Sequence, residues 1–239
     1  ENEFVLSDGT KYYEFNTVTN KGKQIYSLDE AAENALFHDG SQNIAYTKGN
    51  NVYVNTASGL KLIVTDNSDK NIVSGQAIAR SEFGITGGLF WSNDGQHLAF
   101  YQKNESNVHE YPLVDINQTP AELMPIKYPM AGQKSERPKV GIFSLGTQKT
   151  VYISPKGASD DYLTNVVFTP DNKYVLIAEL NRDQNHYYLN VYDVQTGAFV
   201  KTLLEEQNEK WVEPEFPAFF PTEASNNFIW ISEKDGFNN

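Results

Sequence analysis

An acidic loop at residues 81–84 (Ser-Glu-Phe-Gly) holds the residue types best placed to bind a ligand. It leads into an aromatic strand, a tight turn and a second strand over residues 89–101. This strand-turn-strand unit recurs in weaker copies along the chain, whereas the Ser81-Glu82 lead-in occurs once. Repeated units build scaffolds and unique segments usually carry sites, so Ser81 and Glu82 are the first candidates for function. Judged alone, Glu82 also fits a helix start or a solvated loop.

The sequence offers no arrangement for nucleophilic or metal-dependent catalysis. A serine hydrolase of the α/β class shows its nucleophile in a Gly-x-Ser-x-Gly elbow, and this motif does not occur here. The chain has no Cys, which excludes a thiol nucleophile, a thiolate zinc site and a disulfide framework. Its four histidines are widely separated and never at the i, i+4 spacing of a helical metal pair. We therefore expect no catalytic residue, no metal and no cofactor.

Composition places the chain among ordinary globular proteins. Hydrophobic residues make up 39% and charged residues 21% of its 239 residues. The net charge of -12 argues against nucleic acid as a partner, since affinity for phosphate backbones comes from clustered Lys and Arg. No apolar run approaches the ~18 to 20 residues of a membrane-spanning helix, so we expect no membrane contact in this segment. The acidic residues at 205–215 are expected to form a solvated connection.

A repeated unit defines the expected fold. Each copy has an aromatic residue or Leu, then a turn rich in Pro, Asn, Asp or Gly, then an alternating apolar strand; the copies cover residues 36–46, 91–101, 168–178 and, in degenerate form, 220–230. A second pair of strands follows the first three copies, and a partial unit opens the chain. Four strands per unit at roughly 50-residue spacing predict an all-β fold, a β-propeller fragment of about four four-stranded antiparallel blades. A β-sandwich is the alternative, but a sandwich has no reason to repeat one unit at that period.

The spacing of the turns indicates an inserted arm at residues 102–130. Gly40 and Gly95 are 55 residues apart, whereas Gly95 and Asn172 are 77 apart. The surplus falls in a polar stretch with several prolines, whose core contains apolar residues at Leu113, Val114 and Ile116. Such an arm either folds on its own sheet or buries these residues on a partner, and we favour the partner.

The order of motifs resembles the N-terminal β-propeller region of the dipeptidyl peptidase IV family, especially its Bacteroidetes-type members. The resemblance extends over residues 1–239, interpreted as a single partial propeller domain with the α/β-hydrolase domain absent. Its specific parts are Glu-Phe-Gly ahead of Phe-Trp-Ser at residues 82–92, Tyr-Pro-Met-Ala-Gly at 128–132, and the strings at 179–185 and 230–237. Both ends look cut, because the chain opens on Glu1 and stops inside a strand-turn pattern.

The resemblance implies a serine-type hydrolase, an aminopeptidase that removes N-terminal dipeptides with Pro or Ala in second place. The family's catalytic Ser, Asp and His lie in the C-terminal α/β-hydrolase domain, so this segment itself is expected to be non-catalytic. Its implied part is to gate the substrate and to bind the peptide α-amine. The alternative is a propeller that binds a protein partner and has no hydrolase attached.

The resemblance also implies roles for particular residues. The family binds the substrate amine with a pair of acidic residues on a short helical loop; Glu82 takes one of these positions and Ser81 the other, which departs from the pattern. A carboxylate accepts charge-assisted hydrogen bonds from an ammonium group, whereas Ser81 adds only a neutral one. The arm resembles the one through which family members form homodimers, which makes Leu113, Val114 and Ile116 expected interface residues.

The partners expected from the resemblance are peptide N-termini, the C-terminal hydrolase domain of the parent protein and a second copy in a homodimer. We expect an exported protein, in the periplasm or on the cell surface of a Gram-negative bacterium. The lack of Cys is compatible with that location but does not establish it.

Overall fold

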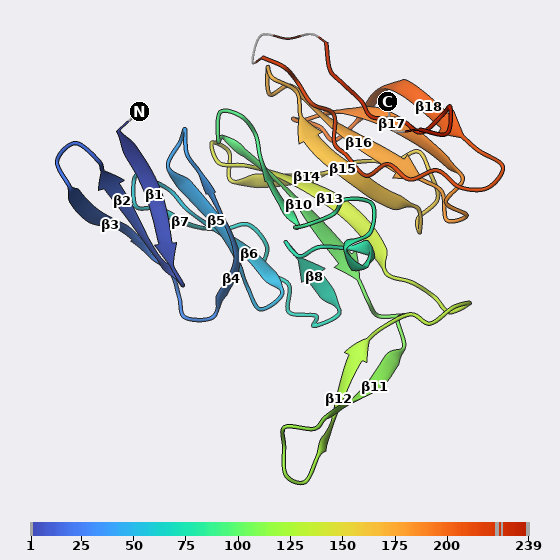
Figure 1. The fold of residues 1–239 in the computed structure, drawn as a ribbon, viewed down its shortest axis with the longest axis horizontal. Helices are drawn as coiled ribbons and strands as arrows, with labels where there is room; N and C mark the ends of the chain where they lie inside the picture. Colours follow the sequence, from blue (N-terminus) through green and yellow to red (C-terminus); the bar gives the residue numbers. More distant parts are fainter. Residues whose placement is uncertain (1, 223–224, 226, 238–239) are drawn as a thin grey trace.

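The chain folds almost entirely into antiparallel β-strands. The computed structural model describes residues 2–222, 225 and 227–237. Within these residues the only helical element is one 3-10 turn, η1 (Ala79–Ser81), and no helix is long and apolar enough to cross a lipid bilayer. Figure 1 shows the sheets following one another along the chain and fanning out side by side. The predicted all-β fold of successive antiparallel blades is confirmed.

Residues 3–63 form two sheets. The first is a meander of β1 (Glu3–Asp8), β2 (Lys11–Asn16) and β3 (Lys21–Ser27). The second is a meander of β4 (Ala32–His38), β5 (Asn43–Lys48), β6 (Asn51–Asn55) and β7 (Lys61–Ile63). Each strand pairs with the next one along the chain, so both sheets are built from local hairpins.

Residues 72–207 form two further sheets and the arm. The third sheet contains β8 (Ile72–Ser74), β9 (Leu89–Trp91), β10 (His97–Asn104), β13 (Arg137–Ser144) and β14 (Lys149–Tyr152). Between β10 and β13, a separate hairpin consists of β11 (Glu110–Asp115) and β12 (Glu122–Lys127). The fourth sheet contains β15 (Tyr162–Phe168), β16 (Tyr174–Leu180), β17 (His186–Asp193) and β18 (Phe199–Gln207). In the described part of the predicted last copy, pairing is limited to a bridge between Phe219 and Ile229.

The repeated turn has the same local hydrogen bonds in the third and fourth sheets. In the third, the Ser92 hydroxyl donates to the Asp94 carboxylate at 2.6 Å. In the fourth, the Thr169 hydroxyl donates to the Asp171 carboxylate at 2.7 Å. Short polar side chains commonly close turns in this way. The repeated sequence unit therefore corresponds to a repeated local structure.

Neighbouring sheets are joined by these turns and by apolar cores between them. The Asn43 side chain donates to the Gly95 carbonyl at 3.2 Å, which links the second sheet to the third. The Asn93 backbone N–H donates to the Asn172 side chain at 2.8 Å, which links the third sheet to the fourth. The core between the second and third sheets includes Val52, Val54, Leu98, Phe100 and Phe143. Each inner sheet thus buries its faces against its neighbours, as propeller blades do.

The loop that carries η1 starts and ends beside one residue of the third sheet, Tyr101 in β10. β9 pairs with the first part of β10 and β8 with its last part, so the two short strands share one edge of β10. Between them, the Gly75 N–H donates to the Tyr101 carbonyl at 2.7 Å, and the Tyr101 N–H donates to the Gly88 carbonyl at 2.9 Å. Residues 76–87 therefore project from the sheet as a loop whose neck is closed at Tyr101.

The neck requires glycine at position 88. A Cβ atom there would overlap the backbone of Gln76 in the opposite limb, whereas a Cβ at Gly87 would meet no described atom within 4 Å. We expect Gly88→Ala to lower the free energy of unfolding by about 1–3 kcal/mol, and Gly87→Ala to change it little. Thermal denaturation of the two variants checks this. Equal losses would show that the close approach of the limbs is not the constraint.

Candidate functional site

The η1 loop has a strained backbone. Ala79, Ser81 and Phe83 have φ values of 50°, 64° and 57°, a region that L side chains rarely adopt. Within the turn, the Ser81 N–H donates to the Ile78 carbonyl at 3.0 Å and the Glu82 N–H to the Ala79 carbonyl at 3.1 Å. Such conformations persist where the surrounding structure fixes them, and they concentrate at functional sites.

The C-terminal side of the loop is fixed by the fourth sheet and the segment after it. Phe83 is buried and its ring lies 4.8 Å from that of Tyr162, at the start of β15. Gly84, with φ of 69°, lies so close to Glu215 that a Cβ would overlap the Glu215 carbonyl oxygen. A loop that starts from the third sheet is therefore held by residues that follow it by 79 positions (Phe83 to Tyr162) and 131 positions (Gly84 to Glu215) along the chain.

The predicted residues Ser81 and Glu82 lie together between two fixed points. On the N-terminal side, the Ala79 N–H donates to Glu136 at 2.8 Å; on the C-terminal side, Phe83 is buried. Ser81 and Glu82 are exposed, and in the described part of the chain no side-chain hydrogen bond or ion pair engages either of them. Both side chains are available to a ligand.

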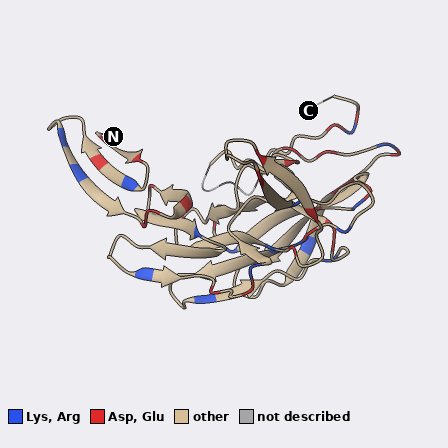
Figure 2. Ribbon diagram, turned by 90° about the horizontal axis from the view of Figure 1, so that it is seen from below, with Lys and Arg blue, Asp and Glu red and all other residues tan. Residues whose placement is uncertain are grey.

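The Glu213 carboxylate lies within electrostatic range of Glu82. Burial raises the pKa of the Glu213 carboxyl, and the charges of Glu215, Glu233 and Glu82 raise it further. Val212 is buried, and its N–H bonds to the turn between β16 and β17, which fixes this segment. Figure 2 shows Asp and Glu, in red, on the loops of the C-terminal part of the chain. Glu82 therefore interacts electrostatically with the Glu213 carboxylate.

The approach of Glu213 to Glu82 was not predicted from the sequence. Its segment has the composition expected for a solvated connection, with acidic residues around Trp211. This clustering of acidic residues was the only feature of the sequence that pointed to a charged site here. The electrostatic interaction depends on packing between segments that are far apart along the chain, which local sequence patterns do not report.

The residue types at the η1 loop are chemically suited to pairing with a cation. A carboxylate such as Glu82 accepts charge-assisted hydrogen bonds, and the Ser81 hydroxyl can add a neutral one. Among the residues that the structure describes, no three His, Cys, Asp or Glu side chains are placed to hold a metal ion. The site is therefore suited to recognition.

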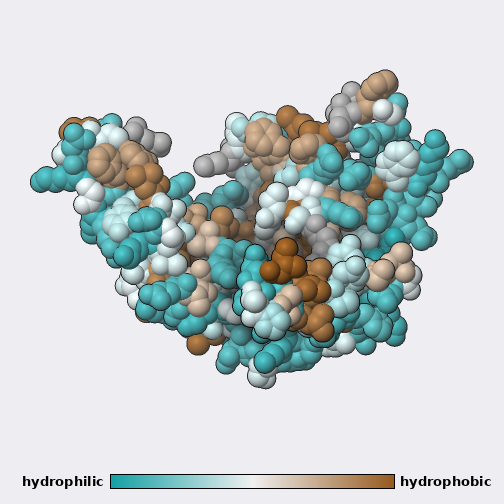
Figure 3. Space-filling model, turned by 60° about the horizontal axis from the view of Figure 1, so that its bottom comes forward, coloured by the Kyte–Doolittle hydropathy of each residue, from teal (hydrophilic) through white to brown (hydrophobic). Residues whose placement is uncertain are grey.

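The predicted arm residues lie on the β11–β12 hairpin. Leu113 pairs with Met124 and Val114 with Leu123. Val114 is 54% exposed and Ile116 82% exposed, whereas Leu113 is partly buried. Figure 3, with the bottom of Figure 1 turned forward, shows hydrophobic side chains gathered in the middle of that face. The arm thus forms its own small sheet, the first of the two alternatives that the sequence left open, and presents apolar side chains to solvent. Burial of these residues on a partner stays a prediction.

The burial of the Glu213 carboxyl and the carboxylates around it, which raise its pKa, predict a pH-dependent gain in stability from Glu213→Gln. A carboxyl whose pKa is raised by folding destabilises the folded state above that pKa and has no effect below its unfolded value. The variant should therefore have a slightly higher Tm than the wild type at pH 7, and this gain should vanish below the usual Glu value of 4.5.

Thermal denaturation between pH 3 and pH 7 measures this gain, with Glu209→Gln as a matched loss of an exposed carboxylate from the same segment. A gain of equal size at pH 3 and pH 7 would contradict the interpretation.

Comparison with known proteins connects this geometry to a family. A family model of the dipeptidyl peptidase IV (DPP IV) N-terminal region matches residues 3–239. Among curated relatives, a protein assigned as dipeptidyl-aminopeptidase B of Paracoccidioides lutzii is 27% identical over 241 residues, covering 90% of this chain and 26% of the relative. One of Neurospora crassa is 27% identical over 240 residues, with the same shares covered. The chain thus spans about a quarter of the length of these relatives.

Solved structures agree. A crystal structure from Bacteroides ovatus, assigned as a dipeptidyl aminopeptidase IV, superposes with a TM-score of 0.90 at 38% identity, over 100% of this chain and 33% of that one. Dipeptidyl peptidase 4 of Porphyromonas gingivalis superposes with a TM-score of 0.82 at 23% identity, over 99% of this chain and 35% of that one, and supports the fold. Because the family model matches nearly every residue, the chain belongs to the family of dipeptidyl peptidase IV N-terminal regions.

Proposed function

We propose that this chain is the non-catalytic propeller part of a dipeptidyl peptidase IV-like serine exopeptidase. In this proposal a hydrolase domain of the parent protein cleaves the substrate, while the propeller gates access and binds the peptide α-amine, so that X-Pro and X-Ala dipeptides are released. The observation that carries the proposal is the exposed Glu82 carboxylate on a loop whose two ends are fixed. Family membership supports it.

A protonated peptide N-terminus suits this loop for physical reasons. An ammonium group has three donors, and a carboxylate is the strongest neutralising acceptor that a protein offers. Glu82 supplies one such carboxylate and Ser81 a neutral acceptor. Glu213 adds negative charge nearby, because the charge of Glu82 contributes to the raised pKa of the Glu213 carboxyl. The charge of Glu215 also contributes to that raised pKa. Attraction of a cation therefore does not depend on a second acid at position 81.

Fixing the amine would also fix the position of cleavage. When one end of a peptide is held at a set place, the number of residues that reach the nucleophile is determined by the distance to it. This requires a loop that does not shift, and the buried Phe83 and the bonded Ala79 N–H supply that rigidity.

We further propose that the arm forms a homodimer interface. Apolar residues that are largely exposed on a small two-stranded sheet indicate association, and Val114, Ile116 and Leu123 are all more than half exposed.

The proposed location is outside the cytoplasm of a Gram-negative bacterium; the likeness to the Bacteroides ovatus protein supports a related bacterial source.

The proposal predicts that Glu82→Gln impairs substrate recognition in the full-length protein. We expect kcat/KM for an Ala-Pro chromogenic dipeptide to fall about 10- to 100-fold, equivalent to about 1.4–2.8 kcal/mol, because the substituted amide cannot neutralise the ammonium group. Discrimination between this substrate and its N-acetylated form should shrink. Steady-state kinetics measures both effects.

Glu30→Gln removes an exposed carboxylate far from the loop in sequence and is the matched control. Unchanged kinetics of Glu82→Gln in an active enzyme would refute amine binding by Glu82. A full-length protein without any activity on these substrates would instead support a protein-binding propeller with no hydrolase attached.

The arm proposal predicts that a charge at the exposed apolar surface weakens dimerisation. We expect Ile116→Asp to shift the full-length protein toward monomer, with Kd raised at least about tenfold, since the introduced carboxylate would have to be desolvated. Sedimentation velocity over a concentration series measures this. Val18→Asp, at a position 71% exposed on the first sheet, is the control, and an equal response of both variants would argue against an arm interface.

A further inference from the structure

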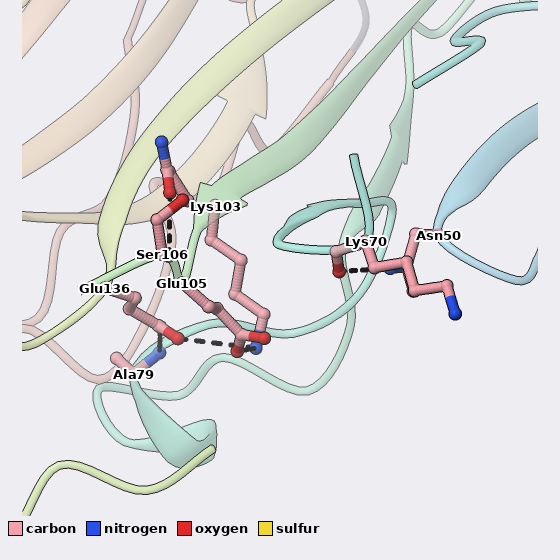
Figure 4. Close-up of polar contacts among 8 residues, drawn as sticks. Asn50, Lys70, Ala79, Lys103, Glu105, Ser106 and Glu136 are labelled. Carbon is pink, nitrogen blue, oxygen red and sulfur yellow. Dashed lines mark hydrogen bonds and ion pairs between the residues drawn. The ribbon is translucent and has the colours of Figure 1, made fainter. Parts of the chain in front are cut away.

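Two carboxylates flank the arm and share one ammonium group. Glu105 follows β10 and Glu136 precedes β13, so the inserted hairpin lies between them. Lys103 Nζ lies 2.8 Å from Glu105 Oε1 and 3.3 Å from Glu136 Oε2. The side chains of Lys103, Glu105 and Glu136 are only 15%, 15% and 17% exposed. Figure 4 shows this polar cluster, which closes the base of the arm.

Glu136 also reaches the η1 loop. Its other oxygen, Oε1, accepts the Ala79 N–H at 2.8 Å, and Ala79 is the first residue of η1. Both oxygens of this carboxylate are therefore engaged, one by Lys103 and one by the loop (Figure 4). In the described part of the chain, Glu105 has no hydrogen bond to η1. The two carboxylates are buried to nearly the same extent and both pair with Lys103, but only Glu136 accepts a hydrogen bond from the described residues of the η1 loop.

The loop needs this contact because its conformation is strained. Ala79 has a φ of 50°, and the turn begins with no side-chain cap at Ile78. A residue in the left-handed region stays there when surrounding contacts fix it. Phe83 fixes the far end of the turn, so Ser81 and Glu82 keep one position only if the near end is held as well. The Glu136 carboxylate provides that hold, and Lys103 offsets the cost of partly burying its charge.

We propose that Glu136 is a positioning residue for Glu82, held in place by Lys103 at the base of the arm. The assignment rests on the proposed function, since it gives Glu136 its effect through the amine site. Glu136 contacts no reacting atom; it sets where the Glu82 carboxylate stands. The base of the arm and the recognition loop are thereby one polar unit.

The test compares Glu136→Ala, Glu136→Gln and Glu105→Ala in the full-length protein with the Ala-Pro chromogenic substrate. We expect Glu136→Ala to raise KM about tenfold with little loss of kcat, as misplacing a binding group does. Glu136→Gln should recover most of this loss, because an amide oxygen still accepts the Ala79 N–H. Glu105→Ala should leave KM near the wild-type value, although it removes a carboxylate from the same Lys103.

A double variant separates positioning from general loss of structure. If Glu136 acts through Glu82, Glu136→Ala should have no further effect on KM in the Glu82→Gln background. Full additivity, an unchanged KM in Glu136→Ala, or an equal rise in Glu105→Ala would each overturn the assignment. An effect of Glu82→Gln without one of Glu136→Ala would refute this inference alone, whereas no effect of Glu82→Gln would refute the proposed function and this inference with it.

Discussion

The closure of the η1 loop on Tyr101 is the constraint on which the rest of the site depends. The Tyr101 carbonyl accepts a hydrogen bond from the Gly75 N–H, and the Tyr101 N–H donates to the Gly88 carbonyl, so both limbs leave the sheet at a fixed separation. The Tyr101 side chain is buried between the third and fourth sheets and packs edge-on against Phe90 at 5.2 Å. The residue that fills the core between two sheets therefore also fixes the root of the loop.

Beyond the neck, the loop depends on three separate parts of the chain. Its near end is held by Glu136 beyond the arm, its far end by Tyr162 in the fourth sheet, and Gly84 by the backbone of Glu215. The contact with Glu136 joins two insertions of the third sheet, whereas those with Tyr162 and Glu215 join the loop to the fourth sheet and to the segment that follows it. A loop on such a scaffold is held at several points by different parts of the chain, and a single hairpin could not supply the same number of fixed points.

Local features of this fold could be predicted from the sequence, and long-range ones could not. The repeated turn is set by hydrogen bonds within a few residues, such as that between Ser92 and Asp94, so its recurrence gave the blade architecture. The exposed placement of Glu82 followed from a family resemblance. The sharing of one β10 edge by β8 and β9 depends on pairing across Tyr101, and the nearness of Glu213 to Glu82 on tertiary packing. Neither leaves a periodic pattern.

The carboxylates that folding brings together near Glu82 also have a cost in stability. Burial of the Glu213 carboxyl, and after it the charges of neighbouring carboxylates, raise the pKa of this group, so its ionised form opposes folding. A chain selected for stability alone would replace or disperse them, since exposed acids are readily exchanged for neutral residues. A bound ammonium group would relieve the repulsion between these carboxylates, and the relief would add to the affinity beyond the direct hydrogen bonds to Glu82.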